Sequence, residues 1–214
     1  MLEIDGTLGY PSLMKALVLP RDKVIEYLEV PEPVQPGADW LLLRVAYCGI
    51  CNSDLHRGFE GGAYRYPLIM GHEFSGVVET VPAGSRFAVG DRVVAYPLLP
   101  CRRCQACQIG QYAQCLAYDY FGSRRDGGFA ERIWVPEANL LKIPARVSLL
   151  AAAMTEPCAV ALHGVNKLEV HPGDTGAVFG AGPVGNMVAQ WLRLRGCRQV
   201  LVADVDERKL EAAA

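Results

Sequence analysis

Short apolar runs with the spacing of β-strands fill the first part of the chain, from about Met14 to Ile143. They are rich in Val, Leu and aromatic residues and are separated by Gly and Pro, which favours strands joined by turns. The clearest runs are KALVLP (15–20), DWLLLRVAY (39–47), FSGVVETV (74–81), DRVVAYP (91–97) and FAERIWVP (129–136). The pattern predicts an irregular, mainly antiparallel β domain over residues 1–150.

The pattern changes near Ser148, where longer apolar segments replace the short runs. LLAAAMTEPCAVALHGV (149–165) predicts a helix that is broken at Pro157. Farther on, an apolar strand (175–179) precedes a helix, and a second strand (200–203) follows it. The apolar positions of that helix recur at helical spacing: Val184, Met187, Val188, Trp191 and Leu192. We therefore predict a mixed fold, with a second, α/β domain over residues 151–214.

Composition and charge narrow the function classes. The chain has 214 residues, which is long enough to bury a hydrophobic core. Its formal net charge of −2 gives no sign of a basic face for nucleic acid. It has no apolar run of 18 residues, so no membrane span is expected. The first residues, MLEIDGTLGYPSL, lack the charged and apolar regions of a signal peptide. We expect a cytoplasmic protein.

Four of the eight cysteines lie within fifteen residues, in the order Cys101, Cys104, Cys107 and Cys115. Cysteines three residues apart can turn their sulfur atoms toward one point, and a tetrahedral Zn²⁺ takes four such ligands. Two disulfides are less favoured because stable disulfides are rare in the cytosol. An iron–sulfur cluster, ranked below zinc, and four unrelated thiols remain as alternatives. A zinc site with all four positions taken by protein would be structural.

The predicted strand–helix–strand unit carries a dinucleotide-binding motif. GAGPVG places Gly180, Gly182 and Gly185 in the pattern G-x-G-x-x-G between the first strand and the helix, and Asp204 ends the second strand. The glycines would allow the tight turn, the approach of the pyrophosphate and close packing of the helix. A carboxylate at Asp204 would accept hydrogen bonds from the ribose and repel a 2′-phosphate, which favours NAD over NADP. Arg208 is the residue that could instead contact a phosphate.

Three further stretches carry residues that could bind a catalytic metal. They are CGICNSDLH, GHEFSG and TEPCAVALHG. A Cys, a His and a Glu drawn from them would make a three-ligand zinc set with one open position, where zinc acts as a Lewis acid on an alcohol oxygen. Each residue also has a structural interpretation, and we take His163 and His171 as structural or surface residues.

In their order and spacing these motifs resemble the zinc-dependent medium-chain dehydrogenases, and the polyol branch of that family in particular. The resemblance covers nearly all of residues 14–214. It rests on GICNSDLH, GHEFSG, the four-cysteine loop, the EP dipeptide, GAGPVG and VADVD. It implies a GroES-like β domain followed by a Rossmann-type domain. It also implies two Zn²⁺ ions, one catalytic and one structural, with NAD as cofactor.

The resemblance assigns roles to individual residues. Ser53 falls on the hydroxyl that takes the substrate proton, and His56 on the histidine that relays it to solvent. Cys48 is then a neighbour of the metal site and not a ligand. Glu73 falls on a carboxylate that is a zinc ligand or lies beside one, so we count it with both the catalytic and the metal residues. The catalytic zinc ligands implied are Cys51, His72, Glu73 and Glu156.

The implied reaction is oxidation of a secondary alcohol of a polyol or polyol phosphate to a ketose. Arg124 and Arg125 could bind a phosphate, or could face solvent or pair with Asp126 or Glu131. Members of the family are longer, so the resemblance implies that this chain holds the N-terminal part of the Rossmann domain and would alone bind NAD poorly. Two alternatives remain: a dehydrogenase of another alcohol, such as threonine, and an inactive zinc-binding chain. A homo-oligomer is expected at full length.

Overall fold

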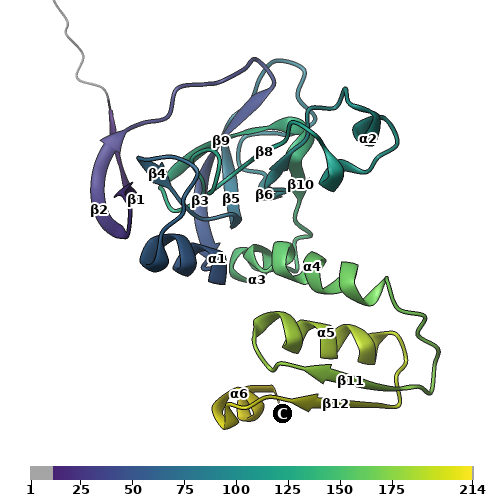
Figure 1. The fold of residues 1–214 in the computed structure, drawn as a ribbon. Helices are drawn as coiled ribbons and strands as arrows, with labels where there is room; N and C mark the ends of the chain where they lie inside the picture. The colour runs from purple at the N-terminus through teal and green to yellow at the C-terminus, as the bar shows by residue number, and fades with distance from the viewer. Residues whose placement is uncertain (1–11, 214) are drawn as a thin grey trace, which may run out of the picture. The chain divides into compact units, whose positions relative to one another are not determined.

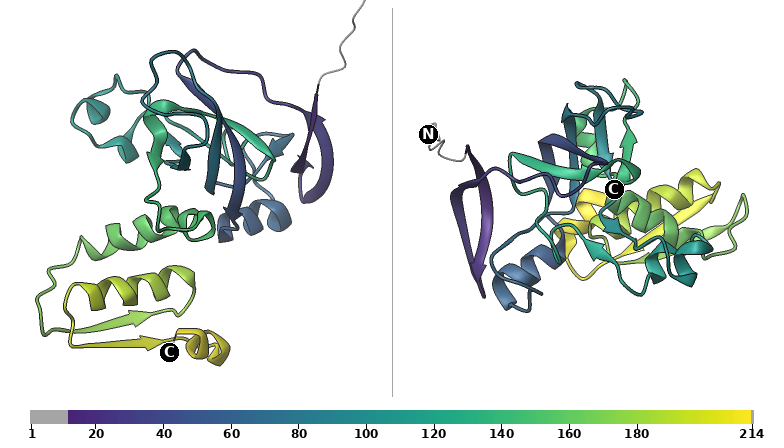
Figure 2. Two further views of the ribbon diagram at one scale, coloured as in Figure 1. Left: turned by 180° about the vertical axis from the view of Figure 1, so that it is seen from behind. Right: turned by 90° about the horizontal axis from the view of Figure 1, so that it is seen from above.

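The computed structural model describes residues 12–213, which divide after Ala153 into two compact units. The N-terminal stretch read above for a signal peptide lies mostly outside the described residues. Figures 1 and 2 show the first unit as a curled β structure and the second as helices on a small sheet.

Within residues 12–153, the first unit contains ten strands. They are β1 (Leu13–Arg21), β2 (Val24–Pro31), β3 (Trp40–Gly49), β4 (Leu68–Ile69), β5 (Glu73–Thr80), β6 (Arg92–Ala95), β7 (Leu98–Leu99), β8 (Asp119–Tyr120), β9 (Arg132–Pro136) and β10 (Leu140–Lys142). Its helical segments are α1 (Asn52–Leu55), the π-helical turn η1 (His56–Glu60), α2 (Gln105–Gln108), η2 (Tyr112–Gln114), η3 (Glu137–Asn139) and α3 (Leu149–Ala153).

The main sheet of this unit has the strand order β10–β6–β5–β3–β9, and its neighbouring strands are antiparallel. A second sheet has the order β2–β1–β4, and β7 pairs with β8. The main core is buried against the five-stranded sheet and includes Leu41, Leu43, Phe74 and Val93. The predicted antiparallel β domain is therefore confirmed.

The second unit contains the predicted strand–helix–strand order. Its elements are α4 (Thr155–Val165), β11 (Thr175–Phe179), α5 (Pro183–Leu194), β12 (Gln199–Ala203) and α6 (Glu207–Ala213). β11 and β12 are parallel. α5 lies between this sheet and α4 (Figure 1). Val178, Leu192 and Cys197 form the buried centre of this layer, which confirms the α/β character of the region.

Two details differ from the pattern. The helix break falls at Met154, and Pro157 lies in the first turn of α4, where its missing N–H has no partner to lose. Val184, predicted to lie on the buried face of its helix, is 46% exposed because it belongs to the first turn of α5. Among the described residues, no helix has the length and apolar character needed to cross a bilayer.

Candidate metal centres and nucleotide-binding loop

The four-cysteine cluster forms on the loop between β7 and β8. Four Sγ atoms lie within 4.8 Å of one another, those of Cys101, Cys104, Cys107 and Cys115. All four are free thiols, and the Sγ atoms of Cys101 and Cys107 are 3.9 Å apart. Sulfur atoms at about 2.3 Å from a tetrahedral ion are separated by about 3.8 Å. The donors therefore fit a Zn²⁺ ion and are too far apart for a disulfide.

The backbone around this cluster favours thiolates. The N–H of Cys101 donates to the Sγ of Cys115 at 3.2 Å. Hydrogen bonds from the backbone at Leu116 and then Cys107 lower the pKa of Cys104 to about 6. Burial raises the pKa of Cys107, so its thiol depends on a cation to lose its proton. The pKa of Cys101 is also lowered, by hydrogen bonds from the backbone at Arg103 and Cys104, so two of the four thiols favour the ionised form that a metal binds.

A second cluster, called the Cys–His–Glu cluster here, forms where β3 and β5 meet. The donor atoms of Cys51, His72 and Glu73 lie within 4.8 Å of one another. Cys51 is the residue that caps the start of α1, and Glu73 begins β5. His72 and Glu73 are buried, with 6% and 8% of their surface exposed. The structure thus brings together three of the four residues predicted as catalytic-zinc ligands.

Burial is the main cause of the shifted pKa values in this second cluster, and it favours the neutral forms of His72 and Glu73. It lowers the pKa of His72, while the negative charge of Asp54 opposes that change. A neutral imidazole has a lone pair available for a metal. Burial, and then the charge of Asp54, raise the pKa of Glu73. A bound cation would offset both the burial and the repulsion, so the electrostatics of the cluster fit a metal ion.

Asp54 was not singled out from the sequence. It is 2% exposed, and its Oδ2 accepts the N–H of Cys51 at 3.0 Å. Its Oδ1 lies 3.7 Å from Nδ1 of His72, and neither atom has a hydrogen-bond partner. A carboxylate behind a ligand histidine is a common way to orient the ring toward a metal. The available signal was an acidic residue three positions after the helix cap.

The two predicted proton-transfer residues lie on one short helical segment. Nη1 of Arg57 donates to both O and Oγ of Ser53, at 3.1 Å each. His56 has its side chain 62% exposed, and its Nδ1 lies 2.7 Å from Oε2 of Glu60. The position of the Ser53 side chain is therefore fixed by Arg57, while His56 faces solvent.

Glu156 lies in the first turn of α4 in the second unit, so its role as a ligand stays a prediction.

The glycine motif forms a tight turn between β11 and α5. Gly180 has φ +106°, a conformation that favours glycine. A Cβ at Gly185 would lie 1.8 Å from the carbonyl oxygen of Gly180, so only glycine fits there. Gly182 caps α5, and Pro183 occupies its first turn, which leaves the helix N-terminus open to phosphate. A hollow of about 510 Å³ lies beside this turn and is lined in part by Gly182 and Asn186.

Asp204 and Arg208 are both engaged within the unit. Oδ2 of Asp204 accepts the N–H of Ala181 at 2.7 Å, and Oδ1 accepts the N–H of Asp206 at 2.9 Å. These bonds lower the pKa of Asp204, so it is a carboxylate at neutral pH. Arg208 binds Asp206 through Nε and Nη2, at 3.1 Å each. The carboxylate therefore lies against the glycine turn, and the guanidinium is paired.

The adjacent arginines differ sharply in their surroundings. Nε of Arg125 lies 2.6 Å from Oδ2 of Asp119, and its guanidinium stacks over Trp40. Arg124 is exposed and lies between the rings of Tyr64 and Tyr118, 4.5 Å from each centroid. Neither residue has Asp126 or Glu131 as a hydrogen-bond or salt-bridge partner among the described contacts. Arg124 is thus oriented by the two rings and by a 3.3 Å hydrogen bond from its Nη2 to the hydroxyl of Tyr118, while the residue as a whole is exposed.

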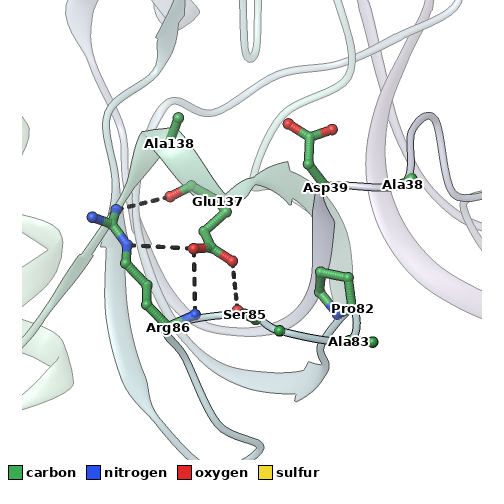
Figure 3. A pocket seen from close by; sticks show the side chains of 9 residues that line it. Ala38, Asp39, Pro82, Ala83, Ser85, Arg86, Glu137 and Ala138 are labelled. Atoms are coloured by element: carbon green, nitrogen blue, oxygen red, sulfur yellow. Dashed lines mark hydrogen bonds and ion pairs between the residues drawn. The ribbon is translucent and has the colours of Figure 1, made fainter.

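A surface hollow of about 640 Å³ lies elsewhere in the first unit (Figure 3). Arg86 and Ser85 both bind Glu137 there, with a 2.5 Å bond from Oγ of Ser85 to Oε2 of Glu137. Ser85, Arg86 and Glu137 are paired with one another in this hollow, and none of the predicted site residues lines it.

Residues 37–145 match the family model for the alcohol dehydrogenase GroES-like domain. The chain belongs to this family. It is 37% identical over 201 residues to galactitol 1-phosphate 5-dehydrogenase of Escherichia coli K12, and the crystal structure of the Escherichia coli enzyme gives a TM-score of 0.88. The match covers 94% of this chain and 58% of that enzyme. The chain thus spans somewhat more than half the length of this relative.

Two other solved structures are similar over 94% of this chain. A zinc-binding dehydrogenase from Sinorhizobium meliloti 1021, solved bound to NADP, is 35% identical with a TM-score of 0.89 and is covered over 59% of its length. An alcohol dehydrogenase from Escherichia coli CFT073, solved with NADH, is 34% identical with a TM-score of 0.87 and is covered over 60%. The predicted membership of the dehydrogenase family and the predicted fold class are confirmed.

Proposed function

We propose that the protein is a zinc-dependent, NAD-linked dehydrogenase that oxidises a secondary hydroxyl group of a polyol or polyol phosphate to a ketone. The observation that carries this proposal is the buried Cys–His–Glu cluster beside the segment that holds Ser53 and His56. The similarity to a galactitol 1-phosphate dehydrogenase supports the substrate class.

Cys51, His72 and Glu73 would hold the catalytic zinc, together with Glu156. Bound zinc supplies a Lewis acid that polarises the substrate hydroxyl group. Ser53, whose Oγ is fixed in place by Nη1 of Arg57, would take the hydroxyl proton of the substrate while its own hydroxyl proton passes on toward His56. His56 would then release that proton to water, because its side chain faces solvent. The four-cysteine cluster would hold a second, structural zinc, since all its donors come from the protein.

The glycine turn of the second unit would bind the pyrophosphate of NAD at the N-terminus of α5. The carboxylate of Asp204 lies at this turn and would repel a 2′-phosphate. Arg208 and Lys209 are nearby cations that could favour NADP, but Arg208 is paired with Asp206 and Nζ of Lys209 lies 4.0 Å from Oδ1 of Asp204. These features support NAD, although one similar structure holds NADP and another NADH.

We expect Arg124 to contact the phosphate of a phosphorylated substrate, because its side chain is exposed and its charge is oriented by two tyrosines, one of which, Tyr118, also accepts a hydrogen bond from Nη2. Arg124→Ala is expected to raise KM for a polyol phosphate and to lower kcat/KM about ten- to a hundredfold, or about 1.5–3 kcal/mol. Steady-state kinetics with a polyol and its phosphate ester make the comparison. Equal effects on both substrates would assign Arg124 to structure.

The proposed function is tested by a zinc count on the purified chain together with a substrate screen on this chain and on a full-length relative, because the chain alone is expected to bind NAD poorly. Two zinc ions per chain, and turnover of polyols with NAD faster than with NADP, are expected. Faster turnover of threonine or a simple alcohol would favour the dehydrogenase of another alcohol. Two zinc ions without turnover of any alcohol by this chain, where the full-length relative is active, would favour an inactive zinc-binding chain, and a single zinc ion in fully loaded protein would contradict the assignment of two metal sites.

A further inference from the structure

Gly49 and Glu73 lie directly opposite each other on neighbouring strands. β3 ends at Gly49 and β5 begins at Glu73, and the two residues are cross-strand partners. In an antiparallel pair, side chains at opposed positions compete for the same space. Here one partner has no side chain, and the other has a carboxylate.

The carboxylate of Glu73 occupies the space that a side chain at position 49 would need. A Cβ built on Gly49 would lie 2.2 Å from Oε2 of Glu73, 3.1 Å from its Cβ and 3.3 Å from its Cδ. The first of these distances is far inside van der Waals contact. Gly49 does not have a positive φ, so its backbone conformation alone does not require glycine. The close neighbours of the added atom are all in the Glu73 side chain.

This placement of the Glu73 carboxylate is the one that completes the Cys–His–Glu cluster. In it, a carboxylate oxygen lies within 4.8 Å of the donor atoms of both Cys51 and His72. The side chain is 8% exposed, so it has little room to reach the same point by another path. The end of a glutamate side chain is flexible, so an added methyl group would move the carboxylate before it moved the strands.

We propose that Gly49 is a positioning residue for the metal site: its lack of a side chain keeps the Glu73 carboxylate within reach of an ion held by Cys51 and His72. The inference rests on the proposed zinc site and adds a residue to its support. It also assigns two different roles within residues 49–51: Cys51 would be a metal ligand, and Gly49 would leave the space that the Glu73 carboxylate occupies.

The test is a double-mutant cycle read out by zinc affinity and not by turnover. Wild type, Gly49→Ala, Glu73→Ala and the double variant would each be loaded with one Zn²⁺ at the four-cysteine cluster. Affinity for the second Zn²⁺ would then be measured by competition with a chelator. We expect Gly49→Ala to weaken this affinity about 10- to 100-fold, as seen when the support of a metal ligand is removed.

The double variant separates positioning from general damage. We expect it to bind zinc no more weakly than Glu73→Ala, because the clash disappears with the Glu73 side chain. Gly164→Ala is the matched control, since a Cβ there meets nothing within 4 Å; it should bind zinc as wild type does. Wild-type affinity in Gly49→Ala, or independent losses that add in the double variant, would overturn the inference.

Two other outcomes also test the role of Gly49: misfolding of Gly49→Ala, and the number of zinc ions that wild type binds. If Gly49→Ala fails to fold, circular dichroism of the double variant decides: recovery of the fold supports the clash with Glu73, and continued misfolding overturns it. If wild type binds a single Zn²⁺ ion, the proposed catalytic site itself fails, and the inference fails with it. If wild type binds two ions and Gly49→Ala behaves as wild type, only the inference fails.

Discussion

Replacement of Cys104 by Ser is expected to remove one of two bound zinc ions and to destabilise the first unit by about 4 kcal/mol, a loss typical of a missing structural metal. The reason lies in the loop itself. Ile109 and Leu116 are 65% and 89% exposed, while the buried side chains of the cluster are Cys107 and Cys115. A loop with so little buried apolar surface depends on its ion to stay ordered.

The measurements are a zinc count and a thermal melt. For a chain of this size, a loss of about 4 kcal/mol lowers Tm by about 8–16 °C. Cys158→Ser is the control, because Cys158 is also a free, partly buried thiol but belongs to neither metal cluster. A Cys104→Ser protein that keeps two zinc ions, or a control that melts equally early, would refute the structural role of the cluster.

The regions predicted well from the sequence are those where local pattern and structure coincide. The glycine turn lies between β11 and α5 as the motif requires, because strand, turn and helix follow one another without a gap. The long strands β3 and β5 were visible as apolar runs. The two-residue strands β7 and β8 were not, because so short a segment has no periodicity to detect.

The metal ligands were found from motifs, but their convergence depends on strand register. Cys51 and His72 are far apart along the chain and meet because β3 pairs with β5 so that Gly49 lies opposite Glu73. No local sequence pattern specifies which residues of β3 pair with which residues of β5. For the same reason, the sequence did not reveal that Asp54 lies beside His72 or that Arg125 pairs with Asp119. These contacts belong to the folded chain and not to a sequence window.

Replacement of Cys51 by Ser is expected to remove the other zinc ion and to leave the fold intact. Cys51 caps the start of α1, and its backbone N–H is already bound by Asp54. Serine is a favoured residue at this position, so the helix should form as before. The melting temperature should therefore stay within a few degrees of wild type, in contrast to Cys104→Ser.

The activity of Cys51→Ser should fall steeply, although its melting temperature should hardly change. A metal acting as a Lewis acid supplies several kcal/mol of transition-state stabilisation, so kcat/KM of Cys51→Ser is expected to fall about a thousandfold or more. Cys48→Ser is the control, because Cys48 is a free thiol three residues away that belongs to neither metal cluster. It should retain its zinc and most of its activity. Loss of activity in Cys48→Ser with little change in Cys51→Ser, measured with the same polyol and NAD, would move the ligand to Cys48 and contradict the assigned site.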